Sequence, residues 1–266
     1  MGAGLLFDQT LCIGCGACAE GCKESNSLPS EVEPRLTAST WTVVEEHDGA
    51  YVRRLCMHCL DPTCVSVCPV AALQRTPEGA VTYDAARCIG CRYCMMACPF
   101  DVPRYQWDRM VPVVGKCTLC AARVTEGRSP ACAEICPTGA TLFGERGALL
   151  TEARTRLDAQ PEQYTGGVYG EHEAGGTAVL MIAGVPFETL GLPARVPHQP
   201  LPMLTWQILS KVPDFVALAG VGLFGLKWIT DRRDAVRAHA EATGGGGPGM
   251  RGRLVEAWRH LTGRTS

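Results

Sequence analysis

The cysteines of this 266-residue chain constrain its fold more than any other feature. All 16 fall into four motifs of four. Motif 1 is Cys12, Cys15, Cys18 and Cys22; motif 2 is Cys56, Cys59, Cys64 and Cys68; motif 3 is Cys88, Cys91, Cys94 and Cys98; motif 4 is Cys117, Cys120, Cys132 and Cys136. Motif 3 is regular and reads CIGCRYCMMACP, whereas motifs 2 and 4 contain insertions and motif 1 ends in Lys23 instead of proline.

The spacing of motif 3 is typical of thiolates that bind a cubane [4Fe–4S] cluster. In such a run three cysteines hold one cluster, and the fourth, followed by proline, serves a second cluster. Iron prefers soft thiolate ligands, and small residues such as Gly14, Gly16 and Gly90 let the backbone wrap closely around a cube. Because one run cannot complete its clusters alone, we expect the motifs to work in pairs.

Two other uses of cysteine fit the pattern less well. Disulfide frameworks belong to short secreted chains and do not come as repeated C-x-x-C-x-x-C triplets. Structural zinc also uses paired C-x-x-C segments, but it leaves no role for the third cysteine or for the Cys-Pro ending. A zinc-binding structural module is the remote alternative. Since the cysteines suffice as ligands, we expect a supporting role for His58. Residues 171–173 could bind a metal, but the glycines that flank them favour a surface turn or a subunit contact.

Charge and glycine patterns exclude other classes of partner. The formal net charge of −2 provides no basic field, so we expect no nucleic-acid partner. Residues 220–225 fit the G-x-G-x-x-G pattern, but no βαβ unit follows, so we expect a small-residue helix face and no nucleotide. Positive charge beside a cluster raises its potential. Four basic residues flank the motifs: Lys23, Arg87, Arg92 and Lys116.

Local patterns predict short elements between and after the motifs. They are a hairpin of strands 41–45 and 51–55, a second hairpin within 71–83, an amphipathic helix over 145–160 and a strand over 177–183. We therefore expect an α+β fold. Its parts are a four-cluster domain at 1–144, a helix, strand and Pro-rich connector packing on it at 145–202, a membrane anchor helix at 203–230 and a basic Gly-rich tail at 231–266.

The predicted anchor rests on an apolar stretch near the C-terminus. Phe215 to Ile229 is apolar except for Lys227, and it reaches spanning length when extended back to Leu204. Trp206 and Trp228 would suit the two membrane interfaces. The alternative is a buried helix or one that lies in the membrane interface.

Charges around this stretch predict its orientation. Arg232, Arg233 and Arg237 follow it, so the positive-inside rule places the C-terminus in the cytoplasm and the cluster domain in the periplasm, at the inner membrane. Residues 1–11 have no basic segment or long apolar segment of the kind that starts a signal peptide. Either the chain stays in the cytoplasm, or a signal preceded this sequence, or the chain is exported with a partner that carries the signal. With the cluster domain in the periplasm, we expect export with such a partner.

The motifs resemble the four-cluster iron–sulfur (beta) subunits of respiratory membrane-bound complexes. The resemblance rests on LCIGCGAC from Leu11, CMHCLDPTCVSVCP from Cys56, CIGCRYCMMACPF from Cys88, KCTLC from Lys116 and PACAEICPTGA from Pro130. The stretches YGEHEAGGT and VPFETL are most similar to the subunit of uptake nickel–iron hydrogenases, with formate dehydrogenase beta subunits close behind.

The resemblance implies two ferredoxin-like dicluster halves related by a pseudo-two-fold axis, and four [4Fe–4S] clusters with crossed ligation. Set A is Cys12, Cys15, Cys18 and Cys136; set B is Cys22, Cys117, Cys120 and Cys132; set C is Cys56, Cys59, Cys64 and Cys98; set D is Cys68, Cys88, Cys91 and Cys94. It also implies a non-catalytic chain that carries electrons between a catalytic subunit and a membrane cytochrome b or other quinone-reactive subunit. The catalytic subunit would hold nickel–iron, or alternatively molybdenum or tungsten as in formate dehydrogenases and other molybdopterin oxidoreductases.

Overall fold

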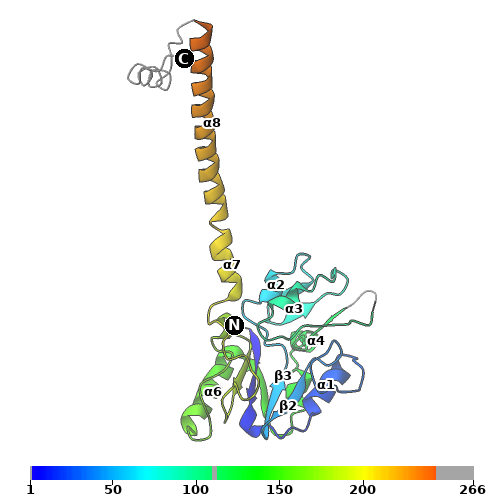
Figure 1. Ribbon diagram of the computed structural model, residues 1–266. Coiled ribbons are helices and arrows are strands. Elements are labelled where there is room, and N and C mark those ends of the chain that lie inside the picture. The colour runs from blue at the N-terminus through cyan, green and yellow to red at the C-terminus, as the bar shows by residue number, and fades with distance from the viewer. Residues whose placement is uncertain (1, 110–112, 244–266) are drawn as a thin grey trace, which may run out of the picture. The chain divides into compact units, whose positions relative to one another are not determined.

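The computed structural model describes residues 2–109 and 113–243. The chain divides into two compact units, residues 1–206 and 207–266. All four cysteine motifs belong to the first unit, whose elements run from blue to yellow in Figure 1. The Gly-rich part of the expected tail, from residue 244 onward, lies outside the described residues.

A three-stranded sheet joins the N-terminal strand to two segments much later in the chain (Figure 1). β1 (Ala3–Asp8) is the middle strand, antiparallel to β8 (Thr141–Glu145) and parallel to β9 (Val179–Ile182). β1 and β9 form strands because their runs of apolar side chains are buried on both faces. β1 ends just before motif 1 and β8 begins just after motif 4, so their antiparallel pairing brings these two motifs to the same end of the sheet.

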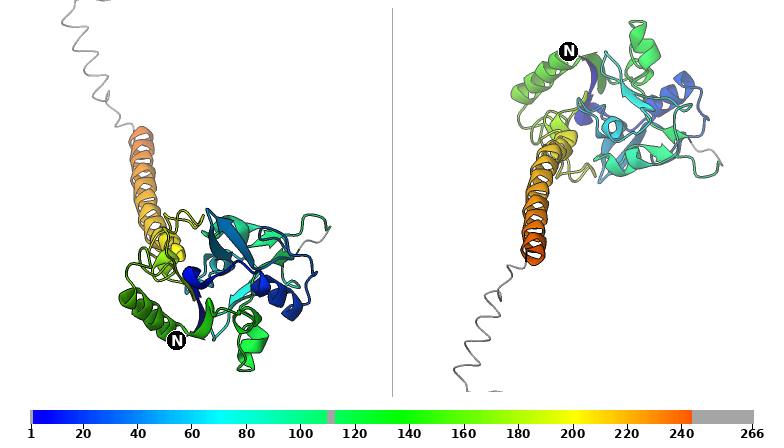
Figure 2. Two further views of the ribbon diagram at one scale, coloured as in Figure 1. Left: turned by 90° about the horizontal axis from the view of Figure 1, so that it is seen from below. Right: turned by 90° about the horizontal axis from the view of Figure 1, so that it is seen from above.

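Helix α6 (Arg146–Ala159) packs against this sheet. Leu149 and Ala153 on one side of the helix are buried in a cluster that includes Leu6 and Ile182. Both views in Figure 2 show α6 on one side of β1, with the segments that carry the cysteine motifs on the other. The expected helix and strand are therefore both present. The strand, β9, pairs with β1 in the central sheet, whereas the sequence predicts only that it packs on the cluster domain.

Two-stranded hairpins carry the chain between motifs. β2 (Val43–His47) pairs with β3 (Ala50–Arg54), β4 (Leu73–Arg75) with β5 (Val81–Tyr83), and β6 (Arg104–Tyr105) with β7 (Val114–Gly115). The first hairpin turns at Asp48 and Gly49, whose φ angles of 50° and 80° suit a two-residue type I′ turn. β2 extends further than predicted because this tight turn lets His47 pair with Ala50.

Short helices begin within or beside the motifs. They are η1 (Gln9–Leu11), α1 (Ala17–Ser25), α2 (Thr63–Ser66), α3 (Tyr93–Ala97), α4 (Ala121–Thr125) and α5 (Ala131–Glu134), and a further 3-10 turn, η2 (Glu173–Gly175), precedes β9. The residues before α1 and α3, Gly16 and Arg92, have φ angles of 75° and 63°. Gly14 and Gly90, two residues earlier in each case, both have a φ of 71°. Motifs 1 and 3 therefore fold in the same way locally.

The apolar C-terminal stretch forms two helices, α7 (Leu201–Leu209) and α8 (Val212–Ala242). The sequence predicts one anchor helix over 203–230, whereas the observed helical stretch runs from Leu201 to Ala242 and is interrupted once. The chain breaks at residues 210–211 because Pro213, near the start of α8, has no N–H to donate and its ring clashes with the carbonyl four residues earlier. α8 runs on to Ala242 because no glycine or proline interrupts residues 226–242.

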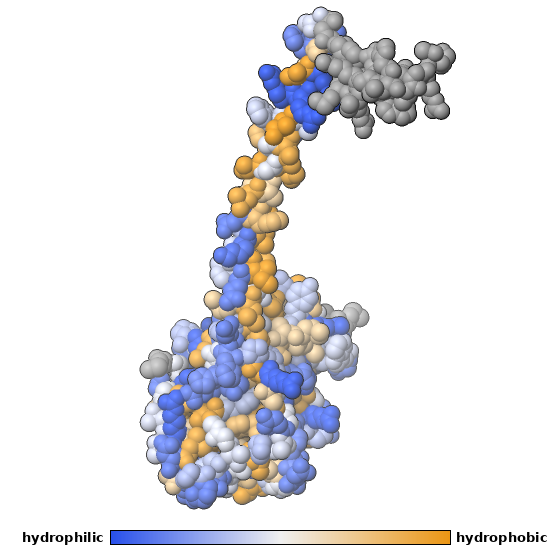
Figure 3. All heavy atoms as spheres, turned by 60° about the vertical axis from the view of Figure 1, so that its left-hand side comes forward, coloured by the Kyte–Doolittle hydropathy of each residue, from blue (hydrophilic) through white to orange (hydrophobic). Residues whose placement is uncertain are grey.

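The first part of α8 carries apolar side chains that are exposed (Figure 3), including Phe215, Leu223 and Trp228. By length and composition, the helical stretch Leu201–Ala242 is long enough and apolar enough to cross a membrane. Residues 220–225, the G-x-G-x-x-G pattern, lie inside α8 rather than at a turn between a strand and a helix. Further along, Lys227 pairs with Asp231 at 2.8 Å.

Candidate metal centres

The four cysteines of set A line a single small cavity. Three of them come from motif 1, whereas Cys136 comes from motif 4. The pairing of β1 with β8 brings Cys136 close to motif 1. Phe7 lies opposite Thr141 in this pairing, and both residues line the same cavity. The wall also includes Arg53 from β3. Side chains from both ends of the cluster domain therefore line one cavity.

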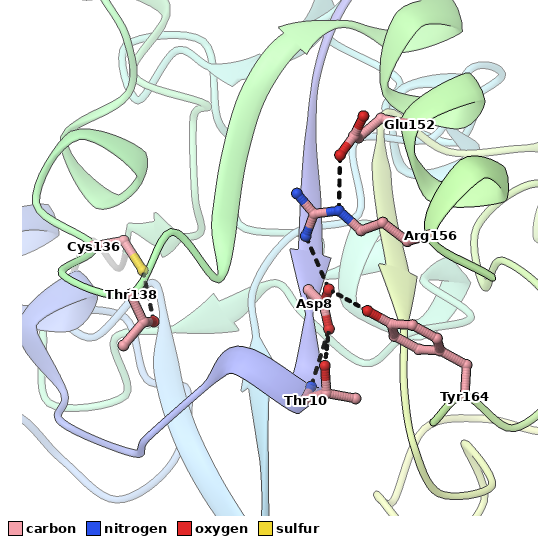
Figure 4. A network of polar contacts seen from close by, with 7 residues as sticks. All are labelled: Asp8, Thr10, Cys136, Thr138, Glu152, Arg156 and Tyr164. Carbon is pink, nitrogen blue, oxygen red and sulfur yellow. Dashed lines mark hydrogen bonds and ion pairs between the residues drawn. The ribbon is translucent and has the colours of Figure 1, made fainter. Parts of the chain in front are cut away.

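Backbone N–H groups surround the thiol of Cys136. Partial burial raises its pKa, but hydrogen bonds from the N–H groups of Thr141, Thr138 and Ala140 outweigh that effect, so the pKa lies below its usual value. The Thr138 hydroxyl is 3.8 Å from the sulfur (Figure 4). The turn after the Cys-Pro step therefore favours the thiolate, which is the form that binds metal.

The four cysteines of set D line a second small cavity. Three belong to motif 3, and Cys68 belongs to motif 2. The N–H of Ala72 donates to the Cys68 sulfur at 3.2 Å, and the N–H of Gly90 donates to Cys88 at 3.4 Å. Burial raises the pKa of Cys68, but the N–H groups that follow it outweigh burial and lower the pKa, as at Cys136.

The thiols of sets B and C are more deeply buried. Burial, reinforced by the neighbouring Cys132 and Cys120, raises the pKa of Cys22 to about 12. Burial, reinforced by the neighbouring Cys56, also raises the pKa of Cys64 to about 12. A bound metal would reverse this preference, because a coordinating thiol is deprotonated. Cys132 and Cys120 belong to the same set as Cys22, and Cys56 belongs to the same set as Cys64. The thiols that act on these two cysteines are therefore the ones expected to share a cluster with them.

Members of successive sets are also electrostatic neighbours. Cys18 of set A interacts with Cys132 of set B. Cys117 of set B interacts with Cys56 of set C. Cys64 of set C interacts with Cys94 of set D. The neighbours therefore follow the order A, B, C, D.

The basic residues near the motifs differ in burial. Lys116 is 2% exposed and Lys23 is 3% exposed, whereas Arg87 and Arg92 are exposed. Arg53 is 1% exposed, and the sequence analysis did not identify it. Its position in the YVRRLC segment looks the same as that of Arg54, so no signal in the sequence separates a buried arginine from a surface one.

His58 belongs to none of the cavities described above but is completely buried. Its Nδ1 accepts the N–H of Val81 at 2.9 Å. Burial and, to a smaller extent, the charge of Lys116 hold its pKa well below the usual value, so the ring is neutral at neutral pH. The supporting role expected for His58 is therefore a structural one, between motif 2 and β5.

A carboxylate at the end of β1 supports the approach to motif 1. Asp8 is 1% exposed and accepts the Thr10 hydroxyl at 2.7 Å and the Tyr164 hydroxyl at 2.9 Å (Figure 4). The Thr10 N–H also donates to Asp8 at 3.1 Å, which caps η1. This network fixes the chain four residues before Cys12.

The donor sets fit cubane clusters better than single ions. Across residues 2–109 and 113–243, no three His, Cys, Asp or Glu side chains converge closely enough to share one ion. Tetrahedral zinc requires four ligands on one metal atom, whereas each thiolate of a cubane binds a different iron. In sets A and D four thiols lie around one cavity, with N–H groups directed at the sulfurs. This arrangement matches a cubane cluster, in which each thiolate binds a different iron.

Comparisons with known proteins agree with this chemistry. Residues 47–146 match the model of the 4Fe-4S dicluster domain. The chain is 40% identical to a protein of Nitratidesulfovibrio vulgaris over 257 residues, covering 90% of this chain and 70% of that protein. It is 39% identical to the hydrogenase-2 operon protein HybA of Escherichia coli O157:H7, covering 71% and 72%. It is 36% identical to the formate dehydrogenase iron-sulfur subunit of Haemophilus influenzae, covering 82% and 77%.

These relatives are matched over most of their own length, and the match to the 4Fe-4S dicluster domain covers motifs 2, 3 and 4. The chain therefore belongs to the [4Fe–4S] dicluster family of iron–sulfur subunits, together with the formate dehydrogenase iron-sulfur subunits and the hydrogenase-2 operon protein HybA.

Proposed function

We propose that the chain holds four [4Fe–4S] clusters and conducts electrons between the catalytic subunit and a quinone-reactive membrane subunit of a respiratory hydrogenase. The observation that carries this proposal is the cavity of set A, where a cysteine from motif 4 completes the three from motif 1. A bound [4Fe–4S] cluster supplies one-electron redox chemistry. The residues of the chain hold the thiolates, exclude water and position the neighbouring charges.

Each set ligates one cluster in this proposal. Sets A and D are supported by their cavities, and each of those cavities includes one cysteine from a second motif. Set B is supported by the neighbours of Cys22, which are Cys132 and Cys120. Set C is supported by the neighbours of Cys59, which are Cys56, Cys98 and Cys64.

The four sites act as a relay in the order A, B, C, D. The neighbour relations between successive sets support this order. Cys15 of set A and Cys91 of set D are exposed, whereas Cys22 and Cys117 of set B are buried. Electrons therefore enter and leave at the two outer sets, where a partner can approach, and the inner sets are insulated.

The two halves of the cluster domain are related by a pseudo-two-fold axis in this proposal. Two pieces of local geometry support it. The positive φ angles in motif 1 recur at the same positions in motif 3. The N–H groups two, four and five residues after Cys136 stabilise its thiolate, and the equivalent groups after Cys68 do the same.

The catalytic partner is a nickel–iron subunit in the first version of the proposal. Its support is the similarity to the hydrogenase-2 operon protein HybA and the stretch YGEHEAGGT. The alternative partner is a molybdenum- or tungsten-containing formate dehydrogenase subunit, supported by a relative matched over 82% of this chain. Metal analysis of the large subunit that co-purifies separates the two, since nickel supports the first and molybdenum or tungsten the second.

α8 anchors the chain in the inner membrane, with the C-terminus in the cytoplasm and the cluster domain in the periplasm. The exposed apolar side chains of α8 support insertion. Arg232, Arg233 and Arg237 follow the apolar part and support the orientation. A signal-bearing partner exported with this chain would bring the folded cluster domain to that side.

The test of the cluster proposal is an anaerobic count of iron and acid-labile sulfide on the purified full-length chain, combined with Mössbauer spectroscopy. The expected result is four cubane clusters per chain. A colourless protein with stoichiometric zinc would replace the proposal with the structural zinc module. Two cubanes per chain would disprove the assignment of all 16 cysteines to clusters.

A further inference from the structure

Arg53 is a cation held in the interior of the cluster domain by neutral groups. Its Nε donates to the Thr42 hydroxyl at 3.0 Å, and its Nη1 donates to the Thr141 hydroxyl at 3.2 Å. Within the described part of the chain, no carboxylate lies within ion-pair distance of Arg53, although the adjacent Arg54 reaches Glu45 at 4.0 Å. A buried charge without a counter-charge is strongly disfavoured unless something else compensates it.

The compensating groups are thiols from two different sets. The side chain of Arg53 contacts the Cys132 thiol of set B, and the Cys18 thiol of set A is the next sulfur whose charge acts on it. Because Arg53 also lines the cavity of set A, its guanidinium is shared by the first two sites of the proposed relay.

One donor of this guanidinium makes no well-aligned hydrogen bond within the described residues, although the side chain approaches the Cys132 thiol. Nη2 is buried and makes no hydrogen bond, although Nε and Nη1 are both satisfied. Unsatisfied buried donors are rare in folded proteins and call for an explanation. A cluster sulfide or a ligating thiolate in set A or B would accept this N–H, which strengthens the case that Arg53 faces the metal sites.

We propose that Arg53 is a fixed counter-charge for the clusters of sets A and B and holds both of their reduction potentials above the values that the thiolates alone would give. This inference rests on the proposed four-cluster function. Reduction adds one negative charge to a cluster, and a buried cation stabilises that charge strongly because little water screens it. The buried cation that acts on Cys64 of set C is Lys116, so set C has a counter-charge of its own.

The test is an EPR-monitored redox titration of the full-length, cluster-loaded chain in its complex. Arg53→Gln removes the charge and keeps hydrogen-bonding capacity. We expect the reduction potentials of the two transitions assigned to sets A and B to fall. The expected decrease in each reduction equilibrium constant is at least tenfold, which corresponds to 59 mV for a one-electron couple. The transitions of sets C and D should stay in place. Arg53→Lys, which keeps the charge, should retain most of the wild-type potential.

Two control variants separate charge from packing. Arg54→Gln removes the neighbouring cation, which pairs with Glu45, and should move no transition. Thr42→Val removes the acceptor of Nε but leaves the charge, and it should also leave the potentials unchanged. A shift in Thr42→Val as large as that in Arg53→Gln would show that packing and not charge sets the potential, and would overturn the proposal.

Other outcomes also decide the question. Unchanged potentials in Arg53→Gln would overturn the proposal, as would equal shifts in the glutamine and lysine variants. If the glutamine variant fails to retain its clusters, the lysine variant decides. Wild-type potentials in that variant support the proposed role of the charge, and lowered potentials refute that role. Fewer than four cubanes in the wild-type chain would instead refute the proposed function, so the two failures are distinguishable.

Discussion

Arg156 Nη1 donates to Asp8 Oδ2 at 2.9 Å, so a helix from the second half of the unit holds the last residue of its first strand (Figure 4). Asp8 is 1% exposed and Arg156 is 24% exposed at its side chain. The pair therefore lies at the border of the interior, where a charge is only partly screened. It ties α6 to the segment that leads directly into motif 1.

Removing the charge of Asp8 should loosen this junction. Asp8→Asn keeps the size of the side chain but leaves Arg156 without its buried partner, so we expect a loss of about 1–2 kcal/mol in stability and a melting midpoint lower by roughly 2–8 °C. Glu152→Gln removes the other carboxylate that contacts Arg156, at 2.8 Å, but Glu152 is exposed. That control should change the midpoint little. Equal effects of both variants in anaerobic thermal melts would contradict a specific role for Asp8.

Cys136→Ser tests the crossed ligation. Because Cys136 lines the cavity of set A, we expect this variant to lose or convert the cluster of motif 1, with about one quarter of the iron released and lower stability near the end of the cluster domain. EPR and iron analysis of the purified chain measure both effects. Thr138→Val removes the hydroxyl 3.8 Å from the sulfur and should keep all the iron. A defect confined to the cluster of Cys117 and Cys120 would show that the crossed pairing is wrong.

Removal of residues 203–266 should separate membrane attachment from cluster binding. All four motifs belong to the first unit, so the shortened chain should keep its full iron content. It should also remain in the supernatant after ultracentrifugation, because α8 with its apolar side chains is gone. Sedimentation of the shortened chain with membranes, in cells that lack the partner subunits, would assign the attachment to another surface.

Protease added to intact spheroplasts tests the orientation. We expect digestion of the cluster domain and protection of the segment after α8, since the arginines that follow the apolar part favour the cytoplasmic side. Immunoblots with one tag near the N-terminus and another at the C-terminus report the two ends. Detergent-permeabilised cells, in which both ends are cut, provide the control. A protected cluster domain in intact spheroplasts would reverse the topology.

The sequence was most informative where the pattern is local. The hairpin before motif 2, the helix that follows β8 and the apolar strand near residue 180 were all predicted, because turn chemistry and periodicity depend on neighbours in the chain. The cysteine motifs were equally clear, since ligand spacing is itself a local property.

Features that depend on distant contacts could not be predicted in this way. The parallel pairing of β1 with β9 joins residues from opposite ends of the first unit, and neither strand carries a sign of its partner. The burial of Arg53 likewise follows from how β3 packs on motifs 1 and 4 and not from its own neighbours. The break before α8 was predictable from Pro213, but the length requirement of a membrane span favoured one continuous helix.

The parallel pairing of β1 with β9 also determines when, during synthesis, the site of motif 1 can be completed. The first strand leaves the ribosome early, yet its partner emerges roughly 10–30 s later at about 5–20 residues per second. During that interval the thiols of motif 1 are already exposed to oxygen and to stray metal ions, and Cys136 is late as well. The site is complete only after β9 has been synthesised. We therefore expect the proteins that insert clusters to act on the released chain, or to protect the thiols of the nascent chain until then.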